Sequence, residues 1–216
     1  RILGAMGCRD DRRIHYVGTD PNPDNFNGGV SGGQYGHLAD FYNTRTYRGN
    51  PVFSETNTYR IFQECAEEIH LNPDFKKEYK GKIDLIFTSP PYFNREAYSE
   101  DPSQSYKKFG SSYESWRDGF LRPTLETAVT WLKSERYLLW NIADILVSGK
   151  YLPLQEDTKN ILEEYGVEYK YTLKMALEGM PGQNRVGEDG KPTCRNYCKV
   201  NDRYLKHEPV MVFWKP

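Results

Sequence analysis

The sequence predicts an α/β fold: a mostly parallel, doubly wound sheet with an antiparallel last strand. Short apolar runs alternate along the chain with amphipathic segments, which is typical of parallel strands joined by helices. The last two apolar runs, at 167–177 and 209–215, have no helix between them and therefore indicate an antiparallel edge. With 216 residues and 14% aromatic side chains, the chain can form one domain with a substantial core.

Periodicity and end signals assign the individual elements. Strands are predicted at 14–18, 59–63, 82–89, 136–146, 167–177 and 209–215, and helices at 2–6, 112–134 and 154–166. A further short helix follows the strand at 59–63. Gly7 and Gly166 stop the first and last helices, and Ser112 or Ser115 can cap the middle one. Pro123 predicts a kink or a split in that middle helix.

The strand at 82–89 reads KIDLIFTS and is nearly continuous in apolar residues, as expected of a strand buried on both faces. Residues 27–36 are rich in glycine but match neither G-x-G-x-x-G nor a P-loop, so a surface loop is the better interpretation. The polar segment 93–112 is a long loop, and long loops in compact domains are often functional. Residues 179–208 are irregular.

Charge and cysteine content narrow the classes of partner. The net charge of -1 gives no overall attraction to nucleic acid, so a nucleic-acid surface must be a local patch. Neither a signal peptide nor an apolar run long enough to span a membrane is found. Cys194 and Cys198 are close in sequence, with His207 as the obvious further zinc ligand, but free thiols in a reducing cytoplasm are favoured.

Ligands of doubly wound sheets bind at the carboxyl ends of the strands. Polar residues stand at four predicted strand ends: Asp20, Gln63 with Glu64, Ser89 to Tyr92, and Asn141 to Asp144. The carboxylate of Asp20 suits two ribose hydroxyls, although an Asx turn before Pro21 is the alternative. Asn141 and Asp144 either line a site or cap a turn.

The most unusual strand end is Ser89-Pro90-Pro91-Tyr92. Proline fixes φ and has no N–H, so two prolines stiffen the turn and leave rigid carbonyl acceptors without neighbouring donors. Such acceptors suit an amino group, which is a double donor, and Tyr92 offers a flat face for a ring. The motif therefore predicts a site for a planar molecule with an exocyclic NH2. A plain proline turn is the simpler alternative.

The sequence TSPPY resembles the catalytic motif of the DNA amino-methyltransferases, which methylate N6 of adenine or N4 of cytosine. The continuation FNREAYS, QSY and SYESW is also similar to these modification methylases. The resemblance covers nearly the whole chain. It implies one methyltransferase domain over 1–216, with a Rossmann-like class I sheet, an antiparallel last strand and S-adenosylmethionine as cofactor.

The resemblance also implies roles for the motif. The Ser89 side chain and the Pro90 carbonyl would accept hydrogen bonds from the target amino group, Pro91 would stiffen the turn, and Tyr92 would stack on the flipped base. Substitution of Ser89 or Tyr92 by alanine would then impair methyl transfer far more than folding. Serine at the first motif position leans toward cytosine N4.

For the cofactor, the resemblance implies Asp20 as the ribose ligand and Glu64 or Cys65 as the contact to adenine. A surface helix start is the alternative for the last two. The family's Phe-x-Gly-x-Gly loop and the strand before it are expected upstream of residues 1–7. The resemblance therefore implies a truncated domain whose sheet lacks its first strand.

The insertion at 179–208 has an excess of basic residues interleaved with Tyr197 and Tyr204, which suits phosphate contacts, and Lys107 and Lys108 add to such a surface. A solvated loop is an equal alternative for the insertion. DNA is the implied partner, with a cognate restriction endonuclease, in a prokaryote or phage. Methylation of adenine N6, of RNA or of a protein, and a catalytically silent binding fragment, remain alternatives.

Overall fold

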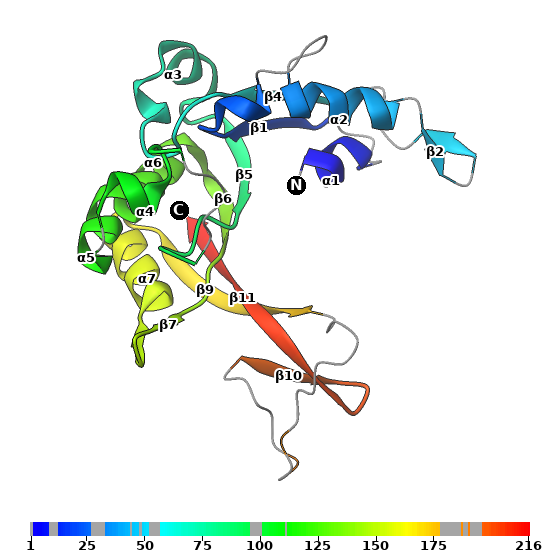
Figure 1. Ribbon diagram of the computed structural model, residues 1–216. Helices are drawn as coiled ribbons and strands as arrows, with labels where there is room; N and C mark the ends of the chain where they lie inside the picture. The colour runs from blue at the N-terminus through cyan, green and yellow to red at the C-terminus, as the bar shows by residue number, and fades with distance from the viewer. Residues whose placement is uncertain are drawn as a thin grey trace. The chain divides into compact units, whose positions relative to one another are not determined.

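A computed structural model of the chain describes residues 2–8, 13–26, 33–43, 45–47, 49–51, 57–95, 101–110, 112–177, 187, 190 and 196–216 (Figure 1). The chain divides into two compact units, an N-terminal unit of residues 1–69 with 99–104 and a C-terminal unit of residues 70–98 with 105–216. None of the helices in the described ranges is long and apolar enough to cross a bilayer.

The N-terminal unit contains a parallel pair of strands with a small core. Its elements are α1 (Ile2–Gly7), β1 (His15–Thr19), η1 (Pro23–Asn25), α2 (Gly33–Asn43), β2 (Thr46–Tyr47), β3 (Asn50–Pro51) and β4 (Thr58–Phe62). β1 pairs with β4 in parallel, from His15 opposite Thr58 to Thr19 opposite Phe62. The helix α2 includes residues 33–36, so the end of the predicted glycine-rich loop is helical. Residues 27–32 lie outside the described residues.

A buried amide closes the first helix. Asn57 is 6% exposed, and its Nδ2 donates to the carbonyl oxygens of Ala5, Met6 and Cys8 at 3.1, 3.2 and 2.8 Å. Its Oδ1 accepts from the N–H of Ile14 at 3.0 Å. Because the last carbonyls of a helix have no partner within it, this side chain stabilises the end of α1, where the sequence indicated only Gly7.

The C-terminal unit has a mixed sheet. Its elements after η2 (Ile69–Leu71) are α3 (Pro73–Tyr79), β5 (Ile83–Thr88), α4 (Ser105–Lys108), α5 (Tyr113–Trp116), η3 (Arg117–Leu121), α6 (Arg122–Trp131), β6 (Leu132–Asn141), β7 (Ile145–Val147), β8 (Lys150–Leu152), α7 (Leu154–Glu164), β9 (Glu168–Leu177), β10 (Tyr197–Val200) and β11 (Arg203–Lys215).

The strand directions confirm the predicted α/β class with an antiparallel last strand. β5 is parallel to β6, and β11 is antiparallel to β6, β9 and β10. Among the described strands of this sheet, β11 therefore runs against the others. The predicted antiparallel pairing of the last two strands is confirmed, and within this pair β11 lies between β6 and β9. The lack of a helix between β9 and β11 indicated the direction of β11 but not its place.

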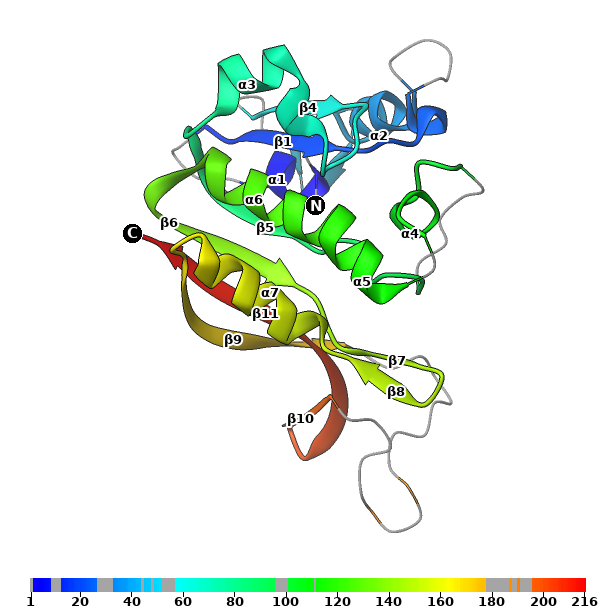
Figure 2. The ribbon, with the colours of Figure 1, turned by 90° about the vertical axis from the view of Figure 1, so that its left-hand side faces the viewer.

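One face of this sheet is covered by helices α6 and α7, which lie in front of it in Figure 2. Apolar side chains of both helices and of the central strands form the core, among them Leu125, Leu138, Trp140, Leu162 and Phe213, each at most 1% exposed. α7 ends in a Schellman motif at Gly166, where N–H groups of Gly166 and Val167 donate to carbonyls of Glu163 and Leu162 at 2.9 and 3.1 Å.

The opposite face of the same sheet carries exposed apolar side chains. Leu85 and Phe87 of β5 are 57% and 49% exposed, and Tyr171 and Leu173 of β9 are 54% and 47% exposed. The expectation that the strand at 82–89 is buried on both faces was therefore wrong for the described part of the chain. Its even-numbered residue Ile86 packs against the core, but its odd-numbered residues point to the other face.

A π-helical turn precedes Pro123 in the long helical segment. The turn η3 spans Arg117–Leu121, and the N–H of Arg122 donates to the carbonyl of Arg117. Proline cannot donate to the helix and its ring crowds the carbonyl four residues earlier, so a wider turn accommodates it. The predicted kink or split at Pro123 is confirmed as a π-turn that joins α5 to α6.

The elements absent from the sequence prediction include helices α2 and α4 and the hairpins β7–β8 and β10–β11. β7 and β8 are joined by Ser148 and Gly149 with φ of 49° and 79°, and β10 and β11 by Asn201 and Asp202 with φ of 48° and 59°. Two consecutive positive φ values are typical of the type I′ turns that join hairpins. Part of the segment 179–208 is thus a hairpin, and α4 lies within the predicted loop 93–112.

Candidate active site

The Ser89-Pro90-Pro91-Tyr92 turn begins where β5 ends. β5 pairs with β6 as far as Thr88, which lies opposite Trp140, and the following prolines cannot donate to a further ladder. Pro90 is buried, while Ser89 and Pro91 are half-buried. The turn therefore lies at the carboxyl ends of two neighbouring parallel strands, where the sequence placed it.

The Tyr92 side chain fastens this turn to the sheet. Its ring is 9% exposed and belongs to the hydrophobic core, and its Oη donates to the carbonyl oxygen of Asn141 at 3.2 Å. Asn141 is 4% exposed, and its Nδ2 donates to the carbonyl oxygen of Pro209 at 3.0 Å. A chain of buried hydrogen bonds thus joins the turn after β5 to the end of β6 and to β11.

Phe93, the residue after Tyr92, has an uncommon backbone conformation. Its φ is 52°, in the left-handed region that bulky residues rarely adopt. Its side chain is 3% exposed and contacts the rings of Tyr113 and Trp116 at centroid distances of 6.0 and 5.8 Å. Such strain costs about 1–3 kcal/mol and persists only where packing enforces it. The aromatic core therefore determines the path of the backbone just after the motif.

This arrangement bears on the predicted role of Tyr92. The sequence offered its ring as an exposed platform for a base, but the ring described here lies in the core. Tyr92 positions the turn through its buried ring and its hydrogen bond to the Asn141 carbonyl. Stacking on a base stays a prediction, and it requires the ring to leave its place beside Asn141.

Of the two candidates at the end of β6, Asn141 contacts the motif. Asp144 accepts a hydrogen bond from the backbone N–H of Gln155 at 3.0 Å, in the first turn of α7. A carboxylate there satisfies one of the unpaired N–H groups of the helix start. Asp144 therefore has the capping role that the sequence left open.

The segment that follows the motif is anchored to α5 and to the π-turn. The indole Nε1 of Trp116 donates to Oγ of Ser105 at 3.1 Å. A Cβ added to Gly119 would lie only 2.3 Å from Cδ1 of Phe109, so the Phe109 ring rests directly on this glycine. The sequence offered no local signal for either contact, because both join residues that are ten or more positions apart.

Tyr113 is a neutral donor within the same aromatic cluster. Burial raises the pKa of Tyr113 well above its ordinary value, and the hydrogen bond to Asp157 raises it further. Tyr113 Oη lies 2.6 Å from Oδ2 of Asp157. The side chain is therefore protonated at any ordinary pH, and it has a structural role next to Phe93.

In the N-terminal unit, Asp20 follows β1 and its carboxylate is well supplied with donors. Oδ1 accepts from the N–H of Asn22 at 2.9 Å, and Oδ2 accepts from Asn25 Nδ2 at 2.7 Å and from Tyr35 Oη at 2.6 Å. The first contact is the Asx turn that the sequence left as the alternative. A carboxylate offers about four acceptor sites, so this arrangement leaves room for one further donor.

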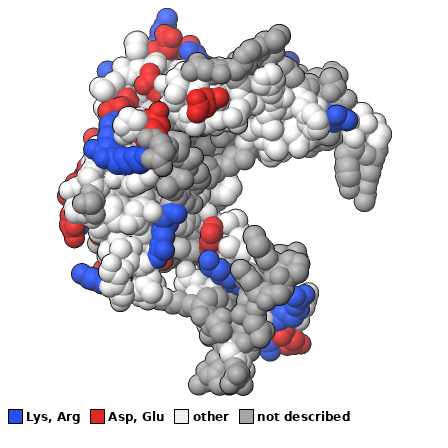
Figure 3. Space-filling view, in the orientation of Figure 1, with Lys and Arg blue, Asp and Glu red and all other residues white. Residues whose placement is uncertain are grey.

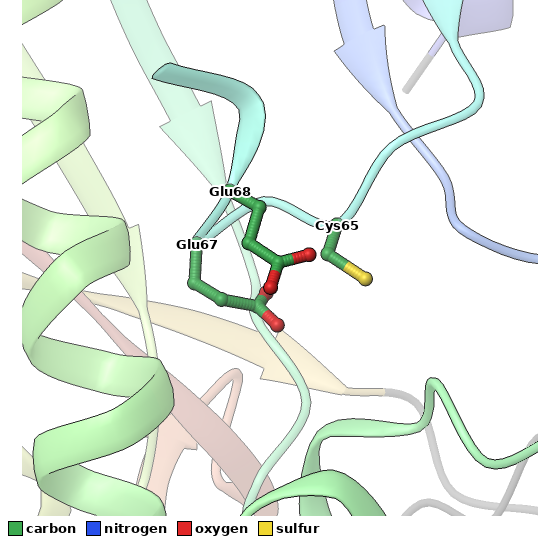
Figure 4. A group of neighbouring side chains, drawn as sticks. All are labelled: Cys65, Glu67 and Glu68. Carbon is green, nitrogen blue, oxygen red and sulfur yellow. The ribbon is translucent and has the colours of Figure 1, made fainter. Parts of the chain in front are cut away.

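Glu64 and Cys65 follow β4, next to the end of β1, since the N–H of Asp20 donates to the carbonyl of Phe62 at 3.0 Å. The structure therefore brings the predicted cofactor residues to one edge of this unit. Ligand atoms of Cys65, Glu67 and Glu68 lie within 4.8 Å of one another in the turn after β4 (Figure 4). Each of these three residues has another interaction as well.

Basic residues of the predicted DNA surface are only partly described. Arg185, Lys191, Arg195 and Cys194 lie outside the described residues. Over the β10–β11 hairpin, at the lower end of Figure 3, Lys and Arg side chains lie beside acidic ones, and Lys199 Nζ lies 2.9 Å from Oδ1 of Asp202. Cys198 is a free cysteine, as are Cys8 and Cys65.

No protein-family model matches the sequence, and no curated protein matches it. The chain resembles the solved structure of a candidate DNA modification methylase from Thermus thermophilus, with 17% identity, 71% of this chain and 52% of that chain covered, and a TM-score of 0.43. The same protein complexed with S-adenosyl-L-methionine is 19% identical, with 70% of this chain and 53% of that chain covered and a TM-score of 0.42. A SAM-dependent methyltransferase from Methanosarcina mazei is 10% identical, with 97% of this chain and 94% of that chain covered and a TM-score of 0.45.

The chain spans about half the length of the Thermus structures that it resembles. A resemblance of this degree leaves the function to be argued from the residues of the site.

Proposed function

We propose that the chain is the catalytic part of an S-adenosylmethionine-dependent methyltransferase that acts on the exocyclic amino group of a DNA base. The observation that carries this proposal is the Ser89-Pro90-Pro91-Tyr92 turn at the carboxyl end of β5, held to β6 and β11 by the Tyr92–Asn141 hydrogen bond. Fixed acceptors at a strand end suit a planar substrate with an amino group. The chain is accordingly proposed to be an enzyme that binds DNA.

The turn acts by positioning and by electrostatics. Ser89 Oγ and the Pro90 carbonyl oxygen each accept a hydrogen bond from one N–H of the amino group. These bonds favour a more tetrahedral nitrogen whose lone pair is no longer delocalised into the ring. Because these acceptors are already fixed by the prolines and by the core contacts of Tyr92 and Phe93, little reorganisation is needed during the reaction. Bound S-adenosylmethionine would supply the electrophilic sulfonium methyl group. No nucleophilic side chain is required.

The proposed substrate is cytosine, at N4. Ser89 stands at the first motif position, and the resemblance to the DNA amino-methyltransferases associates serine there with cytosine more than with adenine. The target base must leave the duplex to reach the turn. Adenine N6 is the second base with the required amino group, and the product distinguishes the two.

The cofactor half of the proposal rests on Asp20, with Glu64 or Cys65 beside it. The Asp20 carboxylate has one free acceptor site on Oδ1, whereas Oδ2 is engaged by Asn25 and Tyr35. One ribose hydroxyl thus fits as the residues stand. A second hydroxyl fits when it replaces the Asn25 or Tyr35 donor.

The test is methyl transfer from radiolabelled S-adenosylmethionine to unmethylated DNA, with the product nucleosides identified by mass spectrometry. N4-methylcytosine is the expected product, and Ser89→Ala should lower the rate about 100-fold, as for loss of one positioned hydrogen-bonding group. Ser134→Ala, at an exposed position of β6, is the matched control and should leave the rate unchanged.

Four outcomes would overturn parts of this proposal. N6-methyladenine as the product would overturn the base assignment, and an unchanged rate in Ser89→Ala would overturn the site assignment. If calorimetric titration of the chain with S-adenosylmethionine shows no binding, the chain is catalytically silent. Methylated RNA or protein in place of DNA would reassign the substrate class.

A further inference from the structure

A cavity of the C-terminal unit lies between α3 and α6, and it shares no lining residue with the turn after β5. Its volume is about 230 Å³. One wall is formed by His70, Lys76 and Lys80, and the other by Pro123, Glu126, Thr127, Thr130 and Trp131. The second set recurs at intervals of three and four residues, so it forms a single face of α6.

The charges of this cavity favour an anion. Lys76 and Lys80 are four residues apart at the end of α3, so their ammonium groups lie on the same side of that helix. Neither forms an ion pair with a carboxylate of the described residues. Glu126 is the acidic residue of the lining. Burial raises the pKa of Tyr165, and the nearby Glu126 raises it further. The lining therefore has two ammonium groups and one carboxylate.

Trp131 adds an unsatisfied donor to the same wall. Its side chain is 3% exposed and packs edge-on against Phe75, with ring centroids 4.5 Å apart. Its Nε1 is buried and has no hydrogen-bond partner among the described residues. Buried indole N–H groups usually find an acceptor. Trp131 and Thr127 both line the cavity, and Thr127 is only 8% exposed.

The C-terminal end of α6 does not cancel the preference of the cavity for an anion. Carbonyls at the C-terminal end of α6 would repel an anion, but Lys215 Nζ donates to the carbonyl oxygens of Val129 and Leu132, each at 2.7 Å. A cation bound at the helix end therefore offsets the carbonyl dipoles.

From these observations we propose that the cavity binds a phosphate group carried by a small molecule. Lys76 and Lys80 hold the phosphate oxygens, Trp131 Nε1 donates to one of them, and Pro123 with the indole ring forms an apolar wall for the organic part. This ligand is independent of the proposed methyl transfer, because no residue of the cavity belongs to the motif turn.

Calorimetric titration of the full chain with inorganic phosphate, at constant ionic strength, tests this site. Lys76→Gln and Lys80→Gln should each raise the Kd about tenfold or more, as expected for loss of a charge-assisted hydrogen bond. Lys77→Gln is the matched control, since Lys77 belongs to the same helix and is exposed but does not line the cavity. It should leave the Kd unchanged.

A second variant tests the indole donor. Trp131→Phe keeps an aromatic ring against Phe75 but removes Nε1, and it should weaken phosphate binding several-fold while the protein remains folded by circular dichroism. The proposal fails if phosphate shows no saturable binding, or if Lys76→Gln and Lys77→Gln have the same Kd. It fails also if a short DNA duplex binds in a Lys76-dependent way and displaces phosphate, because the site would then serve nucleic acid.

Discussion

The hydroxyl of Tyr92 donates a hydrogen bond to the backbone carbonyl of Asn141 across 3.2 Å, with both residues buried. The bond joins residues 49 positions apart and ties the proline turn to the end of the neighbouring strand. Tyr92 is therefore part of the core as well as part of the motif. Any substitution of it must be judged on stability before it is judged on catalysis.

Tyr92→Phe and Tyr92→Ala should separate these two roles. Tyr92→Phe keeps the buried ring and loses one hydrogen bond, so the free energy of unfolding should fall by about 1 kcal/mol. Tyr92→Ala leaves a cavity and should cost about 3–5 kcal/mol. Urea denaturation measures both values, and Tyr171→Phe, at an exposed tyrosine, is the control. The sequence-based expectation that Tyr92→Ala spares folding is thereby revised. A Tyr92→Ala protein as stable as the parent would contradict the core placement.

Asn141→Ala should destabilise the chain without touching the Tyr92 bond itself, because Tyr92 binds the backbone carbonyl. The substitution removes the Nδ2 donor and leaves the Pro209 carbonyl oxygen buried without its partner. The expected loss is about 1–3 kcal/mol in the free energy of unfolding. Urea denaturation of Asn141→Ala, Tyr92→Phe and the double variant gives the coupling free energy between the two hydrogen bonds. Strictly additive losses would show that the two bonds do not act as one network.

Gly119→Ala should be destabilising because the new methyl group would overlap the Phe109 ring. We expect a loss of about 1–3 kcal/mol in the free energy of unfolding, as for overpacking of a core. Gly4→Ala is the matched control, since it adds a methyl group to a helix with nothing within 4 Å and should be neutral or stabilising. Combining Gly119→Ala with Phe109→Ala should restore part of the loss. Equal effects of Gly119→Ala and Gly4→Ala would disprove the contact.

His207 should make the chain less stable in mild acid. Burial lowers the pKa of His207 below its ordinary 6.5, and Lys174 lowers it further. The unfolded chain therefore binds a proton more readily than the folded chain as the pH falls through 6.5, and stability is lost in that direction. Urea denaturation between about pH 5 and 8 should show a decline that is smaller in His207→Gln. An identical pH dependence in the variant would rule out this contribution.

Local features of the site were readable in the sequence. The strand at 83–88 and its stop at two prolines follow from apolar periodicity and from the missing N–H of proline, and the structure has β5 end at Thr88. Pro123 and Gly166 likewise mark a π-turn and a helix end, because their backbone restrictions act within a few residues.

Contacts between distant residues were outside the reach of such patterns. Periodicity shows that a strand has two apolar faces, but it does not show what covers each of them, and Leu85 and Phe87 are exposed where burial was expected. Two further roles depend on partners supplied by the fold: Asp144 caps α7, and Asp20 accepts three hydrogen bonds.

Local sequence patterns were enough to predict the alternation of strands and helices, the antiparallel direction of the last strand, and a rigid proline turn at the end of a strand. The three-dimensional structure was needed to show that β11 lies between β6 and β9, and that the Tyr92 ring is buried in the core with its hydroxyl donating to the Asn141 carbonyl. The reason is physical. Backbone restrictions act locally, whereas register, burial and hydrogen-bond partners depend on which distant segments meet, and that is determined by packing of the whole unit.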